Sequence, residues 1–311
     1  MMSSSEKGWS DYWQKDSADG EVFVNAEGDR HPALAEFWQA HFADLDHGAR
    51  VIDLASGAGS IYAHLPEEHT FQLSAADISD IALAALQERF PQVSAIVCSA
   101  DSIPLDDQSF DAVVTQFGVE YAGVDAFAEA ARLVAPGGRF VGLCHIQDGY
   151  IDSDNQEQLA AARIVAEQAF IDHASRLITA VFSADPAALK DAQDAFAKAA
   201  TPVGERMRRC RKGIHTYLFQ GFRQLYEKRQ QYDLGDITGW LDAMRGELDV
   251  NLERLSRMCG AALSESDVRD IKRIFEAQGL VDVNCTPFET PGNKLPVAWK
   301  ITARKERLQN D

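Results

Sequence analysis

The sequence predicts an α/β protein with a doubly wound, mostly parallel sheet and a large helical insertion. Over the first 150 residues, five short apolar runs alternate with helical patterns, and such alternation is typical of a parallel sheet covered on both faces. Residues 151–260 lack strand-like runs and carry Ala, Gln, Glu and Arg at helical spacing. Beyond them, a helical pattern and two further strands bring the expected total to seven. We therefore expect one α/β domain from 1–150 and 261–311, with 151–260 as a helical insertion.

The expected strands are short apolar runs bounded by turn residues, and they lie at residues 50–55, 71–76, 93–98, 110–115, 139–144, 280–285 and 297–302. Helical patterns cover 31–45, 78–90 and 124–134. Pro136, Gly137 and Gly138 predict a sharp break before the fifth strand. The reversal at 291–293 predicts that the last two strands are antiparallel.

Helices are expected near 154–182, 185–200, 205–231 and 236–258, with joints at Pro186, Pro202, Gly204 and Gly235. In the closing segment, Ser264 and Asp267 have the spacing of a capping box. That helix is expected to end at Gly279.

Charge restricts the partners of this chain. It has 48 acidic and 30 basic residues, a net charge of −18, which argues against general binding of nucleic acid or of an anionic membrane. Residues 1–150 carry a net −17, whereas residues 151–260 carry −1. No apolar run is long enough to span a bilayer, and the N-terminus lacks the apolar stretch of a secretory signal. Five dispersed cysteines predict reduced thiols in a cytoplasmic protein, without a disulfide frame or a metal site.

A glycine turn follows the first strand. Gly57 and Gly59 allow the backbone to approach a ligand closely, and the following helix would offer unpaired N–H groups. Asp77 ends the second strand, 18 residues beyond Gly59, where an acid can hold a ribose diol. Strand, turn and acid together predict a site for a dinucleotide or for another adenosine cofactor.

These motifs resemble those of the class I S-adenosylmethionine-dependent methyltransferases that act on small molecules. The segment 51–60 resembles the first motif of that family, 76–79 its ribose-binding acid, and 99–114 its adenine-contacting acid with the fourth strand. Residues 133–140 resemble the turn before the fifth strand, and 280–302 the reversed final pair. The resemblance covers 50–145 and 261–304. It implies a Rossmann-like methyltransferase fold and S-adenosyl-L-methionine as cofactor.

Two positions depart from the family pattern. Ala55 replaces the usual first glycine, which is acceptable if φ stays negative there, and Ser60 replaces the third glycine, where it is expected to cap the next helix. A nicotinamide-binding domain is disfavoured, because it predicts neither the Pro-Gly-Gly turn nor the reversed final strands.

The resemblance assigns cofactor contacts by position. Asp53 would meet the ammonium of the methionine moiety, Asp77 the ribose, and Asp101 the adenine amine; Ile78 and Ile103 would enclose the adenine. The alternatives are a structural acid at Asp53, a surface acid at Asp101, and core packing by both isoleucines. The full expected set runs around the turn and the ends of the strands: Asp53, Ala55, Ser56, Gly57, Gly59, Asp77, Ile78, Asp101, Ser102, Ile103, Thr115 and Gln116.

Methyl transfer from a sulfonium needs positioning and the exclusion of water, and an acceptor that carries a proton also needs a base. His145 ends the fifth strand at the expected cofactor edge and is the candidate base; a rim histidine bonded to the backbone is the alternative. Glu120 and Tyr121 follow the fourth strand and are candidates for orienting substrate.

Substrate contacts are expected from two further places. Tyr12 and Trp13 belong to an aromatic N-terminal segment that folds over the cofactor or anchors to the domain surface. Arg208 and Arg209 belong to a basic cluster at 206–212, which is either a solvated helix face or a docking site for an anionic substrate. His173 and His215 are expected to be surface or packing residues.

Two classes of function remain open. One is a methyltransferase for a small-molecule acceptor, which is anionic if the basic cluster docks it, with 151–260 as a lid or substrate cap. The other is a non-enzymatic protein that binds S-adenosylmethionine and uses the helical segment for assembly. A homodimer is compatible with both.

Overall fold

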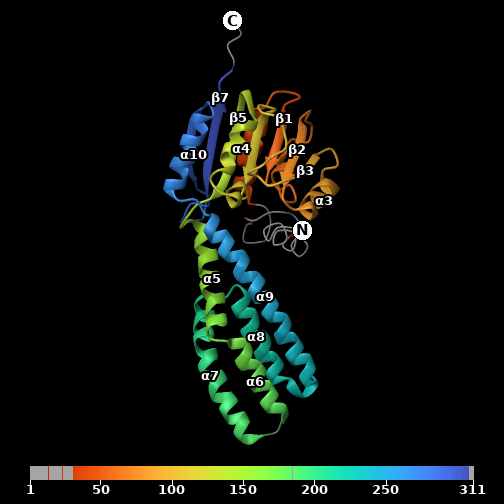
Figure 1. Cartoon of the computed structure of the whole chain (residues 1–311), viewed down its shortest axis with the longest axis vertical. Coiled ribbons are helices and arrows are strands. Elements are labelled where there is room, and N and C mark those ends of the chain that lie inside the picture. The colour runs from red at the N-terminus through yellow and green to blue at the C-terminus, as the bar shows by residue number, and fades with distance from the viewer. Residues whose placement is uncertain (1–12, 14–22, 24–30, 184, 308–311) are drawn as a thin grey trace. The chain divides into compact units, whose positions relative to one another are not determined.

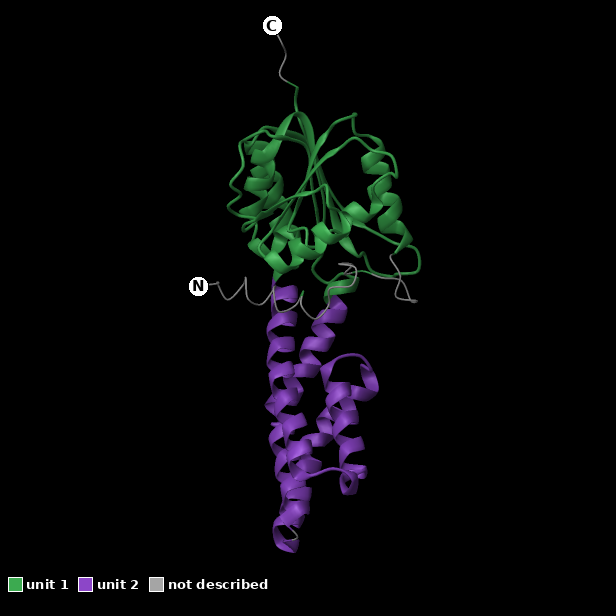
Figure 2. Ribbon diagram, turned by 90° about the vertical axis from the view of Figure 1, so that its right-hand side faces the viewer, with its two compact units in different colours: residues 1–152, 261–311 green, residues 153–260 purple. Residues whose placement is uncertain are grey.

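The computed structural model describes residues 13, 23, 31–183 and 185–307. They form two compact units, one of residues 1–152 with 261–311 and the other of residues 153–260 (Figure 2). Each unit has its own hydrophobic core.

Unit 1 is built on a seven-stranded sheet in the order β3-β2-β1-β4-β5-β7-β6 (Figure 1). β7 is antiparallel to both of its neighbours, and the other pairs are parallel. The strands are β1 (Arg50–Leu54), β2 (Gln72–Asp77), β3 (Ser94–Val97), β4 (Phe110–Gln116), β5 (Val134–His145), β6 (Leu280–Phe288) and β7 (Ala298–Lys305). The predicted fold class is confirmed.

Alternating strand residues divide the core of unit 1 into two layers, because successive side chains of a strand point to opposite faces. Ile52 and Val113 belong to the layer under α4 (Ala126–Leu133) and α10 (Glu265–Ala277). Val51 and Val114 belong to the layer under α2 (Pro32–Ala43) and α3 (Asp80–Arg89). Because helices cover both faces of the sheet, we look for ligand-binding polar groups at the ends of the strands.

The closing segment follows its predicted chemistry. Ser264 accepts a bond from the N–H of Asp267, whose side chain accepts from the N–H of Ser264, so the capping box is formed. Gly279, with φ of +78°, follows the end of α10. By contrast, Pro136, Gly137 and Gly138 lie inside β5, where the register with β4 shifts, and not before the strand as predicted.

Unit 2 is a bundle of helices. Phe170, Leu177, Phe222 and Leu241 are buried at its centre. Its elements are α5 (Tyr150–Glu167), α6 (Phe170–Ser183), α7 (Pro186–Arg209), α8 (Ile214–Glu227), the 3-10 helix η3 (Arg229–Gln231) and α9 (Leu234–Ala261). The helical insertion is thus confirmed, although its joints differ from the prediction.

Two predicted joints are wrong. Pro202 and Gly204 lie within α7, because a 24-residue helix with a long packed face tolerates one interior proline. The helix expected over 154–182 is instead broken between α5 and α6, where Ala169 has φ of +44°. Alanine carries no sequence signal for such a break.

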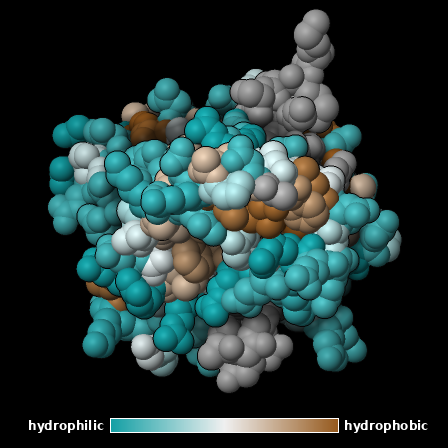
Figure 3. Space-filling view, turned by 90° about the horizontal axis from the view of Figure 1, so that it is seen from below, coloured by the Kyte–Doolittle hydropathy of each residue, from teal (hydrophilic) through white to brown (hydrophobic). Residues whose placement is uncertain are grey.

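Hydrophilic residues cover most of the surface visible in Figure 3, and hydrophobic residues occur there in small groups. Across the described residues, no helix combines the length and the apolar character needed to cross a membrane.

The core of unit 2 yields a stability prediction. The Phe170 side chain is fully buried, with its ring centroid 5.3 Å from that of Phe196 and 6.3 Å from that of Phe222. We expect Phe170→Ala to lower the free energy of unfolding by about 3–5 kcal/mol, because it leaves a cavity among packed rings. Phe182→Ala on the same helix is the control, since Phe182 is 40% exposed. Urea unfolding followed by circular dichroism measures both; equal losses would contradict the assigned core.

Candidate functional site

The glycine turn lies at the carboxyl end of β1, where parallel sheets place ligand sites. Ala55, Gly57 and Gly59 all have positive φ, of +51°, +52° and +81°. The expectation of negative φ at Ala55 is therefore wrong. The turn holds this alanine in a left-handed conformation, which is energetically unfavourable for residues other than glycine.

Ser60 does not cap a helix as predicted. Only the short 3-10 helix η1 (Ile61–His64) follows the turn, and the Ser60 side chain makes no cap bond to it. The Ser60 hydroxyl instead accepts a bond from the Gln116 side-chain amide at 3.3 Å. A single 3-10 turn needs no hydroxyl cap, which leaves this serine available to tie the glycine turn to the end of β4.

Asp77 ties the glycine turn to the start of α3. One carboxylate oxygen accepts from the Gly57 N–H and the other from the Ser79 N–H, each at 2.8 Å. Burial raises the pKa of the Asp77 carboxyl, while bonds from the Ser79, Gly57 and Ile78 N–H groups oppose that rise. These three donors occupy three of the roughly four acceptor sites of the carboxylate, which leaves room for a further donor.

Asp53 is a buried carboxylate without a bond. Its side chain is 1% exposed, and neither oxygen has a hydrogen-bond partner among the described residues. Burial first, and then the charge of Asp77, raise the pKa of the Asp53 carboxyl well above its usual range. A buried acid without hydrogen bonds costs free energy, so Asp53 is a candidate to meet a ligand group that donates hydrogen bonds or carries positive charge.

The two polar residues at the end of β4 hold the frame of the site. The Thr115 hydroxyl donates to the Leu54 carbonyl at 2.9 Å, which joins the ends of β4 and β1. The Gln116 carbonyl accepts from the Trp38 indole N–H at 2.5 Å. Both side chains lie at the predicted edge, but the bonds seen there are structural.

Glu120, Tyr121 and His145 come together as predicted from the ends of β4 and β5. Glu120 lies in the 3-10 helix η2 (Val119–Ala122), and its Oε1 accepts from the His145 backbone N–H at 2.8 Å. The same oxygen lies 2.7 Å from His145 Nδ1. The Tyr121 ring packs edge-on against the His145 ring, with centroids 5.6 Å apart.

The residues expected to contact the adenine differ in their exposure to solvent. Ile103 is buried in the core of unit 1, and its N–H donates to Glu129 at 3.1 Å. Ile78 is half-buried, whereas Asp101 and Ser102 lie exposed in the loop after β3.

Trp13 lies against the glycine turn. A Cβ on Gly57 would be 2.4 Å from Trp13 Cζ2, so the indole fills the space that the missing side chain leaves. Trp13 is 8% exposed and packs with Ala58 and Ala82. Tyr12, the other predicted aromatic contact, lies outside the described residues.

The basic cluster belongs to unit 2, where Arg208 and Arg209 are exposed at the end of α7. Arg206 lies 3.7 Å from the Glu157 carboxylate, and Lys212 lies 4.0 Å from that of Asp154. His215 is not a surface residue: it is fully buried, and its Nε2 lies 2.8 Å from the Cys210 carbonyl.

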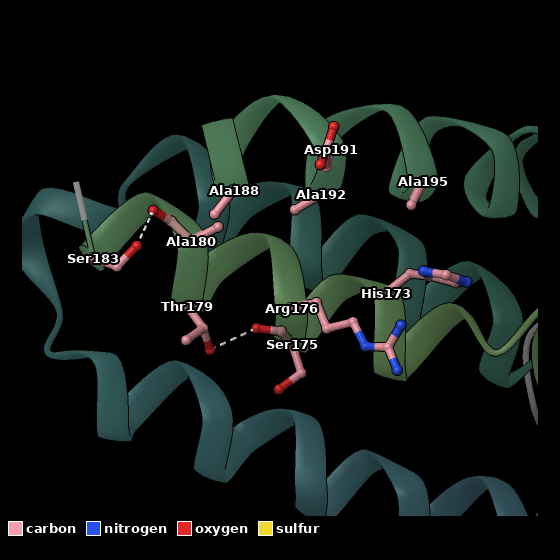
Figure 4. A pocket seen from close by; sticks show the side chains of 10 residues that line it. All are labelled: His173, Ser175, Arg176, Thr179, Ala180, Ser183, Ala188, Asp191, Ala192 and Ala195. Atoms are coloured by element: carbon pink, nitrogen blue, oxygen red, sulfur yellow. Dashed lines mark hydrogen bonds between the residues drawn. The ribbon is translucent and has the colours of Figure 1, made fainter. Parts of the chain in front are cut away.

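Unit 2 also contains a groove of about 490 Å³ between α6 and α7 (Figure 4). Ala180, Ala188 and Ala192 line it, and the Thr179 hydroxyl donates to its own helix at the Ser175 carbonyl. Of the residues singled out from the sequence, His173 lies in the lining of this groove. Its Nδ1 is buried and has no hydrogen-bond partner among the described residues. Within the described part of the chain, no group of three or more His, Cys, Asp or Glu side chains is placed to hold a metal ion.

The sequence does place Phe117 and Gly118, with Thr115 and Gln116, after the fourth strand, where open sheets bind ligands, but it does not show their contact with the glycine turn. Phe117 has φ of +52°, and a Cβ on Gly118 would be 2.6 Å from the Ala55 carbonyl oxygen. These residues press the loop after β4 against the glycine turn. A glycine directly after a predicted strand is the signal that could have indicated this close approach.

Comparisons with known proteins agree with this geometry. A family model described as a methyltransferase domain matches residues 51–138. The demethylmenaquinone methyltransferase of Beutenbergia cavernae is 35% identical over 96 residues, which are 30% of this chain and 40% of that protein. A ubiquinone/menaquinone biosynthesis C-methyltransferase of Methylobacterium nodulans is 35% identical over 123 residues, which are 32% of this chain and 48% of that protein.

Among solved structures, the geranyl diphosphate C-methyltransferase of Streptomyces coelicolor is similar at 18% identity and a TM-score of 0.40, over 47% of this chain and 67% of that one. The chain spans less than half the length of the two curated relatives named above. Residues 51–138 form a methyltransferase domain, which supports the predicted resemblance to the class I S-adenosylmethionine-dependent methyltransferases. The cofactor of that family is S-adenosylmethionine.

Asp53 yields a prediction for the ligand-free protein. Because the pKa of its carboxyl is raised in the folded state, stability is lost as pH rises from the usual value of 3.8 through the folded-state value. Asp53→Asn removes the charge, so we expect the variant to melt above the parent at neutral pH. The two should converge in acid, where the protonated carboxyl resembles the amide. Differential scanning calorimetry across pH measures this; a variant less stable at neutral pH would show that Asp53 is stabilised there.

Proposed function

We propose that this chain transfers the methyl group of S-adenosylmethionine to a small-molecule acceptor at the carboxyl edge of the unit 1 sheet. The observation that carries the proposal is the buried, unbonded carboxylate of Asp53 beside the glycine turn. The ammonium group of S-adenosylmethionine would compensate such a group by charge and by hydrogen bonds.

The residues present fit this cofactor, which supplies a methyl group activated on a sulfonium. Asp53 would accept from the ammonium of its methionine part. Asp77 would accept from the ribose hydroxyls through the lone pairs that Gly57 and Ser79 leave unused. The bare backbone of Gly57 would let the ligand approach, with Trp13 as the aromatic wall next to it.

On the acceptor side, His145 is the group that would take a proton, and Glu120 and Tyr121 would orient it or the substrate. Support comes from the Glu120–His145 contact of 2.7 Å at the carboxyl end of β5, two strands from Asp53. The names of the related proteins point to quinone precursors as one class of small acceptor. The acceptor atom, the cytoplasmic location and a homodimer stay predictions.

Asp77 gives the direct test of the cofactor assignment. We expect Asp77→Ala to lower the affinity for S-adenosylmethionine ten-fold or more, because a charge-assisted bond worth about 1.5–3 kcal/mol is lost. Asp106→Ala, on an exposed loop of the same unit, is the control and should bind normally. Titration calorimetry measures both, and unchanged affinity of Asp77→Ala would refute the ribose assignment.

The role of 151–260 as a lid or substrate cap is a further prediction. Within unit 1, the residues that flank this segment in the chain are joined, since the Leu263 N–H donates to the His145 carbonyl at 2.8 Å and Ile146 bridges to Leu263. We expect replacement of 153–260 by a short Gly-Ser linker to retain cofactor binding and to abolish transfer, as measured with labelled cofactor and a metabolite extract. Transfer at the parent rate would favour an assembly role for the segment.

A further inference from the structure

The contact between Glu120 and His145 determines which ring nitrogen carries a proton. Glu120 Oε1 accepts the His145 backbone N–H and also lies 2.7 Å from Nδ1. Both side chains are buried, at 0% and 1% exposure. An ionised carboxylate can only accept, so Nδ1 of a neutral His145 ring must hold the proton and donate it to Glu120. Nε2 is then left with a free lone pair.

Nε2 has no partner among the described residues, although it is buried. The groups around the pair are the Phe117 ring, 4.8 Å from the His145 ring, the Tyr121 ring and the Cys144 thiol. Burial and then the nearby Glu120 carboxylate raise the pKa of Cys144 well above its usual value, so this thiol stays protonated and cannot supply charge. A buried acceptor of this kind indicates a ligand that donates a hydrogen bond.

The loop that carries Glu120 is fixed in place. The Phe117 N–H donates to the Leu143 carbonyl at 2.7 Å, and the Val119 N–H donates to the Thr115 hydroxyl at 3.3 Å. Gly118 has no room for a side chain beside Ala55. This strained turn supports a role in which the Glu120 side chain is held in one geometry.

Charge limits the acceptor further. Asp53, Asp77 and Glu120 are all buried, and none of them belongs to an ion pair with Lys or Arg among the described residues. The cofactor would compensate Asp53 and meet Asp77, and its sulfonium charge would lie at the methyl group. An anionic acceptor atom would have no proton to donate to Nε2 and would lie near the Glu120 carboxylate in a medium of low dielectric constant.

We propose that Glu120 is a positioning residue that holds His145 in its Nδ1–H tautomer, and that the acceptor presents a neutral O–H or N–H group to Nε2. The proposal rests on the proposed function and replaces the anionic acceptor considered from the sequence. In the step, the acceptor atom forms a bond to the methyl carbon as the carbon–sulfur bond breaks and its electron pair goes to sulfur. The acceptor proton passes to Nε2 and from there to solvent, so the products are S-adenosylhomocysteine, the methylated acceptor and one proton.

Tautomers are measured directly by long-range ¹⁵N–¹H correlation in the full chain with labelled histidine. We expect His145 to show Nδ1–H with an unprotonated Nε2 at neutral pH. His215 is the internal reference, because its Nε2 faces the Cys210 carbonyl and should show the opposite tautomer. His145→Gln and His215→Gln assign the signals. An Nε2–H tautomer or a doubly protonated ring at His145 would overturn the proposal.

Glu120 variants separate positioning from packing. Glu120→Ala should release the tautomer and lower kcat by roughly 10²-fold with little change in KM for the cofactor. Glu120→Gln keeps an accepting oxygen, so it should retain the tautomer and regain part of the rate. The acceptor for these assays is the one identified by labelling a metabolite extract with S-adenosyl-L-[methyl-³H]methionine.

The same labelling identifies the acceptor class. A labelled ether, amine or amide derived from a neutral group supports the proposal, and a labelled methyl ester of a carboxylate or phosphate overturns it. Absence of any labelled product would contradict the proposed function instead, while the histidine tautomer would still test the role of Glu120.

Discussion

The two bonds that Asp77 accepts from the Gly57 and Ser79 N–H groups fix the cofactor edge of this molecule. They join the glycine turn after β1 to the start of α3, so the turn cannot move independently of the helix. The positive φ angles of Ala55, Gly57 and Gly59 depend on that anchoring, since an alanine at φ of +51° needs a surrounding structure that holds it. Trp38, Gln116 and Ser60 extend the same frame to β4 through two side-chain bonds.

Within this frame, unit 1 buries three carboxylates without a compensating cation among the described residues. Asp77 is satisfied in part by backbone N–H groups, and Glu120 by His145 through Oε1 only, whereas neither Asp53 oxygen has a partner among the described residues. Charges of one sign gathered at the ends of β1, β2 and β4 favour a cation that binds across them. These buried carboxylates lower the stability of the ligand-free protein. Binding of the cationic cofactor would compensate them and thereby stabilise the folded state.

The sequence predicted most of the unit 1 sheet because strand alternation, the capping box at Ser264 and the reversal at 291–293 are local signals. It placed Glu120 and Tyr121 after β4 and His145 at the end of β5, and the structure adds that their side chains contact one another. Features that depend on tertiary packing could not be predicted from the sequence. The left-handed Ala55 and Ala169, the interior Pro202 of α7 and the contact of Gly118 with Ala55 depend on packing between distant segments. Asp53 could be placed at the end of β1 from the sequence, but its burial without a hydrogen-bond partner among the described residues could not.

Proton release on cofactor binding tests the central claim most directly. Titration calorimetry of S-adenosylmethionine in buffers of different ionisation enthalpy counts the protons exchanged. The raised pKa of the Asp53 carboxyl in the ligand-free protein should fall when an ammonium group binds beside it, so binding should release up to one proton in the pH range where this carboxyl is protonated. Asp53→Asn should abolish that release while still binding measurably. Binding of the cofactor to the parent chain without any proton release, from mildly acidic to neutral pH, would contradict the account of Asp53 as the unpaired acid that receives the cofactor.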